Sequence, residues 1–137
     1  MRIMRIVGID VSAKSLDVCL QTPQGKRLAV FSNDQAGFKK LAKFIVSGTT
    51  PVQICMEATG TYHFDAAVYL DHKKYIQVMV INPRIARKFA ESLNRQDKTD
   101  SVDACVLAEY CARMEFVLWQ KPRDEYIKLR GFSRHLA

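Results

Sequence analysis

The sequence contains no run of apolar residues long enough to cross a membrane, although 48% of its 137 residues are hydrophobic. It also has no secretory signal pattern, because Met1–Arg5 leads into a short strand-like segment and not into a long apolar region with a cleavage site. Internal repeats and low-complexity segments are absent too. These absences argue against membrane and exported proteins, and we expect one intracellular globular domain.

Paired cysteines are also missing. The chain has four cysteines, and no two of them form a C-x-x-C pair. Each lies inside an apolar stretch, which favours small buried side chains in a reducing compartment over zinc ligands or disulfides. The four residues are Cys19, Cys55, Cys105 and Cys111.

Acidic residues are scarce relative to basic ones. The chain has 14 aspartates and glutamates against 21 lysines and arginines, which gives a net charge of +7. A basic surface indicates a polyanionic partner such as nucleic acid, and this indication is stronger if the catalytic centre itself is acidic.

Hydrophobic periodicity predicts an α/β fold in which helices follow the first three strands. The predicted chain begins with a three-stranded meander over residues 3–31 and a helix capped by Asn33. A strand over 52–56, a helix ending near Leu70 and a strand over 75–81 follow. The last two elements are a helix with Pro83 at its first position and Ile85, Phe89 and Leu93 on one face, and a helix capped by Thr99. Right-handed crossovers then predict a mixed five-stranded sheet of order 3-2-1-4-5, with strand 2 antiparallel and helices on both faces.

Two acids in the segment Lys98–Ala104 fall on the apolar side of the last predicted helix. Asp100 and Asp103 are three residues apart, so on a helix they share one face. Carboxylates directed at a core are costly unless a cation compensates them.

Asp10 and Glu57 end two strands that the predicted order makes neighbours, at the switch point where open α/β sheets bind ligands. We therefore predict a four-carboxylate site for Mg²⁺ or Mn²⁺, and two such ions can hold both oxygens of a phosphoryl displacement.

Three segments resemble the signature blocks of the IS110/IS1111-type transposases, which are also called DEDD transposases and are related to the Piv-type DNA invertases. These segments are Gly8–Ser12, Glu57–Gly60 and Lys98–Ala104, and Asn82-Pro83 also fits the pattern. The resemblance covers about residues 5–115 and implies a ribonuclease H-like (RuvC-like) domain. It also implies that the catalytic and metal-binding residues are Asp10, Glu57, Asp100 and Asp103.

The resemblance further implies a function and a set of partners. Members of this family cleave and transfer DNA strands during transposition of an insertion sequence, guided by a structured bridge RNA. The implied setting is the cytoplasm of a bacterium or archaeon, and the implied assembly is a homo-oligomer, a dimer or larger. Members also have a second domain whose serine attacks DNA together with the metal site.

The end of the chain departs from this pattern. We expect residues 1–115 to form the catalytic domain, and residues 116–137 to begin a helical linker to a second domain that is absent from this sequence. Ser133 is not assigned as the nucleophile, because its short tail offers no supporting scaffold. Complete transposition by this polypeptide alone is therefore not expected.

Several basic residues lie close to the predicted acids in sequence or topology. We predict that they contact the phosphate backbone of nucleic acid. They are Lys14, Arg84, Arg87, Lys88, Arg95 and Lys98. For Lys39, Lys40 and Lys43 of the first helix, an ordinary solvated role is favoured.

Three other functions fit the same sequence. An autonomous ribonuclease H-like nuclease or junction resolvase would use the same acids. A non-catalytic remnant would only bind nucleic acid or intact copies. An actin-like ATPase or sugar kinase also opens with an apolar strand and a Gly-x-Asp turn, but its phosphate loop is richer in glycine and threonine than Asp10–Lys14.

Overall fold

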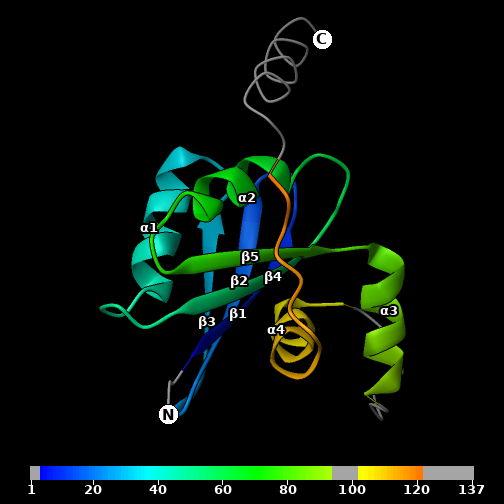
Figure 1. The fold of residues 1–137 in the computed structure, drawn as a ribbon. Helices are drawn as coiled ribbons and strands as arrows, with labels where there is room; N and C mark the ends of the chain where they lie inside the picture. Colours follow the sequence, from blue (N-terminus) through cyan, green and yellow to red (C-terminus); the bar gives the residue numbers. More distant parts are fainter. Residues whose placement is uncertain (1–3, 94–101, 122–137) are drawn as a thin grey trace, which may run out of the picture.

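Five strands form one mixed sheet in the order β3-β2-β1-β4-β5 (Figure 1). The computed structural model describes residues 4–93 and 102–121. β1 pairs antiparallel with β2 and parallel with β4, which confirms the predicted sheet. The strands are β1 (Arg5–Val11), β2 (Ser15–Thr22), β3 (Gly25–Ser32), β4 (Val52–Glu57) and β5 (Ile76–Ile81).

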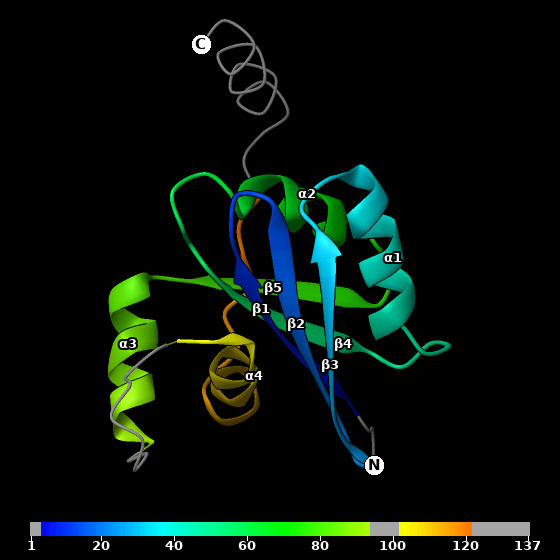
Figure 2. The same cartoon turned by 180° about the vertical axis from the view of Figure 1, so that it is seen from behind.

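Four helices are described, and they cover both faces of the sheet, as predicted. They are α1 (Gln35–Ile45), α2 (Phe64–Asp71), α3 (Pro83–Ser92) and α4 (Ala104–Arg113). α1 and α2 lie against one face, whereas α4 crosses the other face with α3 beside it (Figures 1 and 2). None of these helices is both long and apolar enough to span a bilayer.

Alternation along the strands divides the apolar side chains between the two faces. On β4, Ile54 and Met56 belong to the large core beneath α1 and α2. Cys55, between them, belongs to a smaller core that includes Leu107 and Cys111 of α4. Residues two apart in a strand share a face, so the α4 face of each strand can be identified from these contacts.

Gly8 allows α4 to approach β1 very closely. A Cβ atom at this position would lie 2.0 Å from the carbonyl oxygen of Ala104 and 2.3 Å from the backbone nitrogen of Ala108. Glycine is required here because of this close approach, since its φ is not positive. This contact places the first turn of α4 against Gly8, which lies two residues before Asp10 on the same face of β1.

Two predicted helix starts are wrong. Asp34, and not Asn33, caps α1, because its Oδ1 accepts hydrogen bonds from the Gly37 backbone nitrogen (2.8 Å) and the Ser32 hydroxyl (2.7 Å). α4 begins at Ala104 with Asp103 as its cap, and the predicted cap, Thr99, lies outside the described residues.

The predicted apolar face of α3 is not its most buried face. Pro83 follows the capping residue Asn82, as expected, and the Asn82 side chain accepts from the Arg84 backbone nitrogen at 2.7 Å. However, Ile85 is 47% exposed, and the buried residues are Ala86 and Ala90. The small side chains let α3 lie close to α4, so the larger Ile85 is left at the solvent side.

Residues 115–121 cross the outer edge of the sheet at β5 without forming a regular element (Figure 1). The Trp119 backbone nitrogen donates to the Val78 carbonyl at 2.8 Å. The Trp119 ring packs edge-on against Phe64 of α2, with the ring centroids 6.0 Å apart. This segment therefore covers part of an otherwise unpaired sheet edge.

The four cysteines are free, as expected; three are buried and Cys105 is half-buried. Burial raises the pKa of both Cys19 and Cys111 to about 12. These two thiols therefore stay protonated at neutral pH and behave as small apolar side chains.

Candidate functional site

Asp10 and Glu57 lie side by side at the carboxyl ends of β1 and β4. The parallel register pairs Ile9 with Met56, and Asp10 and Glu57 are the next residue on each strand. Both are on the α4 face, because Asp10 is two residues after Gly8 and Glu57 is two residues after Cys55. Two acids that are 47 positions apart in sequence therefore lie next to each other at the carboxyl-terminal end of the sheet, as the predicted strand order required.

Asp103 approaches these acids from the beginning of α4. Its Oδ1 accepts a hydrogen bond of 2.9 Å from the Val106 backbone nitrogen, so the side chain is an N-cap. The predicted reason for its position, a place on the apolar helix face, is thus wrong, although Asp103 is near Asp10. The partial positive charge of the helix N-terminus also favours a carboxylate here.

Asp17 is a further acid at this site that the sequence analysis missed. It lies on β2 directly opposite Asp10 in the antiparallel register. Asp10, Asp17 and Asp103 line one hollow of about 320 Å³, which β3 closes with the exposed side chains of Leu28 and Val30. Asp17 could have been predicted from the pairing of the first two strands, because a turn at residues 12–14 places residue 17 opposite residue 10.

The carboxylates interact unfavourably with one another. Burial raises the pKa of Asp10 above its ordinary value of 3.8, and the negative charges of Asp17 and Asp103 raise it further. Burial also raises the pKa of Glu57, with a second contribution from Asp10 and a smaller opposing one from Arg87. A cation at this point would relieve the repulsion among the acids.

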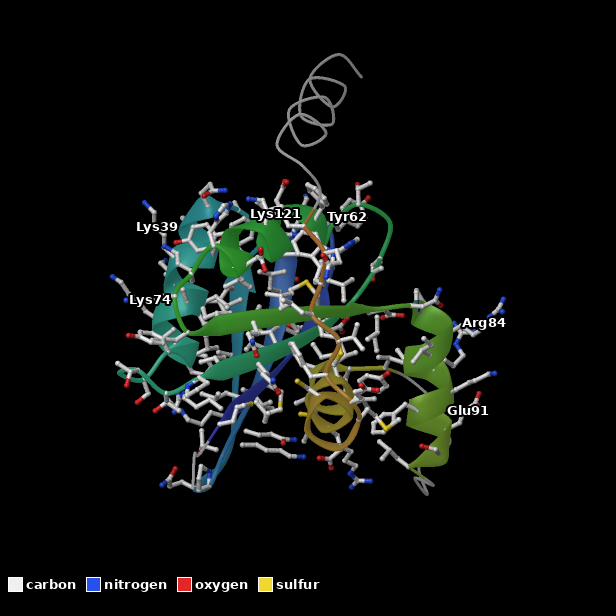
Figure 3. All side chains as sticks on the ribbon, viewed as in Figure 1. Lys39, Tyr62, Lys74, Arg84, Glu91 and Lys121 are labelled. Carbon is white, nitrogen blue, oxygen red and sulfur yellow. The ribbon has the colours of Figure 1, made fainter. Side chains whose placement is uncertain are left out.

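The predicted basic residues divide into three groups. Arg87 of α3 is close enough to Glu57 to influence its charge. Lys14 lies in the exposed β1–β2 turn, and Arg84 and Lys88 are exposed on α3, where Figure 3 shows Arg84 pointing away from the sheet. Arg95 and Lys98 lie outside the described residues.

The fourth predicted acid, Asp100, also lies outside the described residues. Among residues 4–93 and 102–121, no three histidine, cysteine, aspartate or glutamate side chains are arranged so that they could hold one metal ion. The described acids thus form an electrostatically coupled group, and the complete tetrad stays a prediction.

Comparison with known proteins identifies the family. The family model of the IS110-type DEDD transposases, described as "Transposase", matches residues 7–137. The chain belongs to this transposase family. The match extends through residues 116–137, beyond the part of the chain in which the sequence motifs were found.

Two curated relatives of this DEDD transposase chain are called pilin gene-inverting proteins. One is from Moraxella bovis and the other from Moraxella lacunata, and each is 32% identical over 131 residues. The aligned region is 93% of this chain but 40% of each relative. Family membership also decides against the actin-like ATPase or sugar kinase alternative.

Proposed function

We propose that this chain supplies the metal-binding catalytic half of a DNA transposase or recombinase. The observation that carries the proposal is the meeting of Asp10 and Glu57 at adjacent parallel strand ends, with Asp103 on the same side of the sheet. The family match and the gene-inverting relatives support DNA strand exchange as the reaction. The proposed reaction is metal-dependent cleavage and transfer of DNA strands in transposition.

The chemistry of these side chains fits Mg²⁺ or Mn²⁺. Carboxylate oxygens are the ligands that such hard cations prefer, and Asp10 and Glu57 are only partly buried, so an ion can reach them. Burial, followed by repulsion from neighbouring acids, raises the pKa of both Asp10 and Glu57, and a divalent cation would offset the cost of charging them. We propose Asp10, Glu57, Asp100 and Asp103 as the ligands and catalytic residues, with two ions bound.

Metal ions bound there would stabilise negative charge on the attacking and leaving oxygens of a phosphodiester. The protein's own groups prepare the site for this reaction. The hydrogen bond that Asp103 accepts from the Val106 backbone nitrogen fixes its orientation at the N-terminus of α4. Arg87 partly balances the charge of Glu57 and provides a cation beside the position of a scissile phosphate.

We also propose nucleic-acid partners for this site. We propose that Lys14, Arg84, Arg87 and Lys88 contact the DNA backbone beside the acids, together with Arg95 and Lys98. The finer parts of the proposal are a bridge RNA guide, a homo-oligomeric assembly and action in the cytoplasm of a bacterial or archaeal cell. The chain spans 40% of the length of the curated relatives it matches. We propose that residues 116–137 lead toward a second domain.

Calorimetric titration with Mn²⁺ tests the metal site directly. We expect the Asp10→Asn/Asp103→Asn variant to lose most of the binding heat, because two of the four proposed ligands lose their charge. Asparagine keeps the N-cap of α4, so the fold should be retained. Asp34→Asn is the control, since it changes another capping aspartate, which caps α1 on the opposite face of the sheet from α4 (Figure 1).

Equal Mn²⁺ binding by the wild type and the double variant would refute the metal-site proposal. A second assay with hairpin, hybrid and four-way-junction substrates separates the related enzyme functions. Efficient metal-dependent cutting of junctions by the 137-residue chain alone would favour an autonomous resolvase over a transposase domain.

A further inference from the structure

Two cysteines from distant parts of the chain meet at the first turn of α4. Cys19 of β2 pairs with Gly8 in the antiparallel register, so both residues lie on the α4 face of the sheet. Cys19 is fully buried in a small cluster with Ala104 and Ala108 of α4. Cys105 packs against this cluster, and its thiol is hydrogen-bonded to that of Cys19. The fold therefore brings two sulfur atoms from different elements into contact.

The Cys105 thiol is the accessible member of this pair. Cys105 is half-buried, and it lines the hollow of about 320 Å³ that Asp10, Asp17 and Asp103 also line. Cys19, in contrast, is 0% exposed. Burial, followed by the hydrogen bond to Cys105, raises the pKa of Cys19 to about 12, so Cys19 stays a protonated thiol. A reagent that enters the hollow therefore meets Cys105 first.

The charge of the hollow limits the kind of reagent that can reach Cys105. Three carboxylates line the hollow, so anionic oxidants are repelled from it. Hydrogen peroxide is small and uncharged at neutral pH, and it converts an accessible thiol to a sulfenic acid. A sulfenic acid that touches a second thiol condenses with it to a disulfide, and Cys19 is that second thiol.

We propose that hydrogen peroxide oxidises Cys105 and that Cys19 then closes a disulfide between α4 and β2. In the first step the Cys105 sulfur attacks the peroxide, an S–O bond forms as the O–O bond breaks, and the departing oxygen leaves as water with the thiol proton. In the second step the Cys19 sulfur attacks the Cys105 sulfur, the S–O bond breaks, and the hydroxyl group leaves as water with the Cys19 proton. Two thiols lose two electrons, one peroxide gains them, and the products are one disulfide and two waters.

The disulfide would change the position of Asp103, which is two residues before Cys105. A disulfide bond of about 2.05 Å is much shorter than a hydrogen-bonded contact between two sulfurs, so its formation draws α4 and β2 together. α4 already touches the Gly8 backbone and cannot move deeper into the sheet, so its first turn tilts toward β2. β4 lies on the other side of β1 from β2, so this tilt carries Asp103 away from Glu57. Oxidation thus weakens the site for Mg²⁺ or Mn²⁺, a consequence that rests on the proposed function.

A second cysteine pair in the same fold provides an internal comparison. Cys55 of β4 and Cys111 of α4 share the smaller core on the same face of the sheet. They are 0% and 3% exposed, and neither of them lines the hollow. Peroxide should therefore leave this pair reduced, although it too joins a strand to α4.

Oxidation of the 137-residue chain tests the proposal. The reduced protein is treated with a small excess of hydrogen peroxide, denatured in an alkylating reagent and digested for mass spectrometry. We expect a cross-link between the Cys19 and Cys105 peptides of one chain, which dithiothreitol removes, whereas Cys55 and Cys111 should be alkylated. The cross-linked chain should also melt several degrees higher than the reduced chain, because the bond closes the long loop between residues 19 and 105.

Three variants assign roles to the thiols. In Cys19→Ala the reaction should stop at the sulfenic acid of Cys105, which dimedone captures. In Cys105→Ala, peroxide should leave Cys19 unmodified. Cys111→Ala is the matched control, since it removes another cysteine of α4 and should form the same cross-link as the wild type. Melting temperatures of the reduced variants show whether they fold, and the cross-link in the wild type decides the proposal without them.

Calorimetric titration with Mn²⁺ tests the effect on the acids. Peroxide is removed by desalting before the titration. We expect the cross-linked wild type to bind Mn²⁺ about 10-fold or more weakly than the reduced protein, because the orientation of a proposed ligand changes. Reduction should restore the affinity. Peroxide treatment of Cys105→Ala should leave its Mn²⁺ affinity unchanged.

Each outcome has a defined meaning. Oxidised Cys105 without a cross-link to Cys19, or a disulfide between the Cys105 thiols of two copies, would overturn the proposal. Equal cross-linking of Cys55 with Cys111 would overturn it as well, because access through the hollow would then not decide the reaction. A cross-linked chain with unchanged Mn²⁺ affinity would refute the coupling to the acids. If the reduced chain bound no Mn²⁺, the metal-site proposal would fail, whereas the cross-link and the melting temperature would still decide the disulfide.

Discussion

Asp10 faces another acid directly across the β1–β2 hairpin. Like charges opposite each other in an antiparallel pair destabilise the sheet, so the Asp10–Asp17 pair is unfavourable in the metal-free chain. The pKa of Asp10 is raised by burial and by this neighbour, and the pKa of Glu57 is raised by burial and by Asp10. These two acids therefore decrease stability when they are charged, which is typical of groups whose role is binding a cation.

The sign of this effect predicts a pH-dependent gain on substitution. An acid whose folded pKa lies above its unfolded value binds more protons in the native state, so its contribution to stability is lost as the pH rises through the folded pKa. In EDTA, we expect Asp10→Asn to melt a few degrees above the wild type at pH 7 and to show less difference near pH 4. The measurement is thermal unfolding by circular dichroism between these pH values.

The Asp65→Asn variant serves as a control, because Asp65 is an exposed acid on α2, on the other side of the sheet. Added Mn²⁺ should raise the melting temperature of the wild type but not that of Asp10→Asn. If Asp10→Asn were less stable than the wild type at pH 7 without metal, the combined cost of burying the Asp10 charge and placing it beside other acids would not dominate its contribution to stability.

Some site residues could be predicted from sequence and others could not. Asp10 and Glu57 were predictable because each ends a short apolar run, and crossover rules make those two strands neighbours. Asp17 was missed because it occupies an ordinary polar position in an alternating strand, and only the pairing register brings it opposite Asp10.

At the scale of elements, α4 sets the position of Asp103 through its contact with β1. Periodicity predicted this helix, but it could not decide where the helix begins, because Thr99 and Asp103 are both good capping residues. The observed start depends on close packing, in which the Ala104 and Ala108 backbone lies against Gly8. A local capping preference is worth about 1 kcal/mol, so packing of this kind can override it.

Gly8→Ala tests this contact. The added methyl group would meet backbone atoms of Ala104 and Ala108, which cannot move without displacing α4. We expect the free energy of unfolding to fall by about 1–3 kcal/mol or more, as measured by urea denaturation. Because α4 carries Asp103, Mn²⁺ affinity should fall at the same time.

Gly48→Ala separates packing from backbone strain. Gly48 has a φ of +56°, and nothing lies within 4 Å of an added Cβ atom. This variant should lose about 1–2 kcal/mol from its left-handed backbone conformation and keep its metal affinity. If Gly8→Ala also kept full metal affinity, the coupling between the β1–α4 contact and the site would be refuted.

At the scale of the whole molecule, residues 115–121 join the two cores at the edge of the sheet. Phe116 packs on the core beneath α4, and Trp119 packs on the core beneath α1 and α2. The division between a domain of residues 1–115 and an extension of residues 116–137 stays a prediction. These contacts mean that a chain cut at residue 115 would lose apolar burial from both faces and would expose β5.

Chains ending at residue 115 and at residue 121 test that division. We expect the shorter chain to be less stable by about 2 kcal/mol or more in urea denaturation, because it loses the half-buried Trp119 and Phe116. It should also associate more strongly than the 137-residue chain in sedimentation velocity at micromolar concentration, because the Val78 carbonyl at the edge of β5 loses its partner. Trp119→Ala in the 137-residue chain is the matched variant: it removes the contact with Phe64 but keeps the Trp119 backbone hydrogen bond to Val78, so it should be destabilised yet keep the association state of the wild type. Equal stability and the same association state for both shortened chains would place the domain boundary at residue 115, whereas the expected difference places residues 116–121 inside the folded unit.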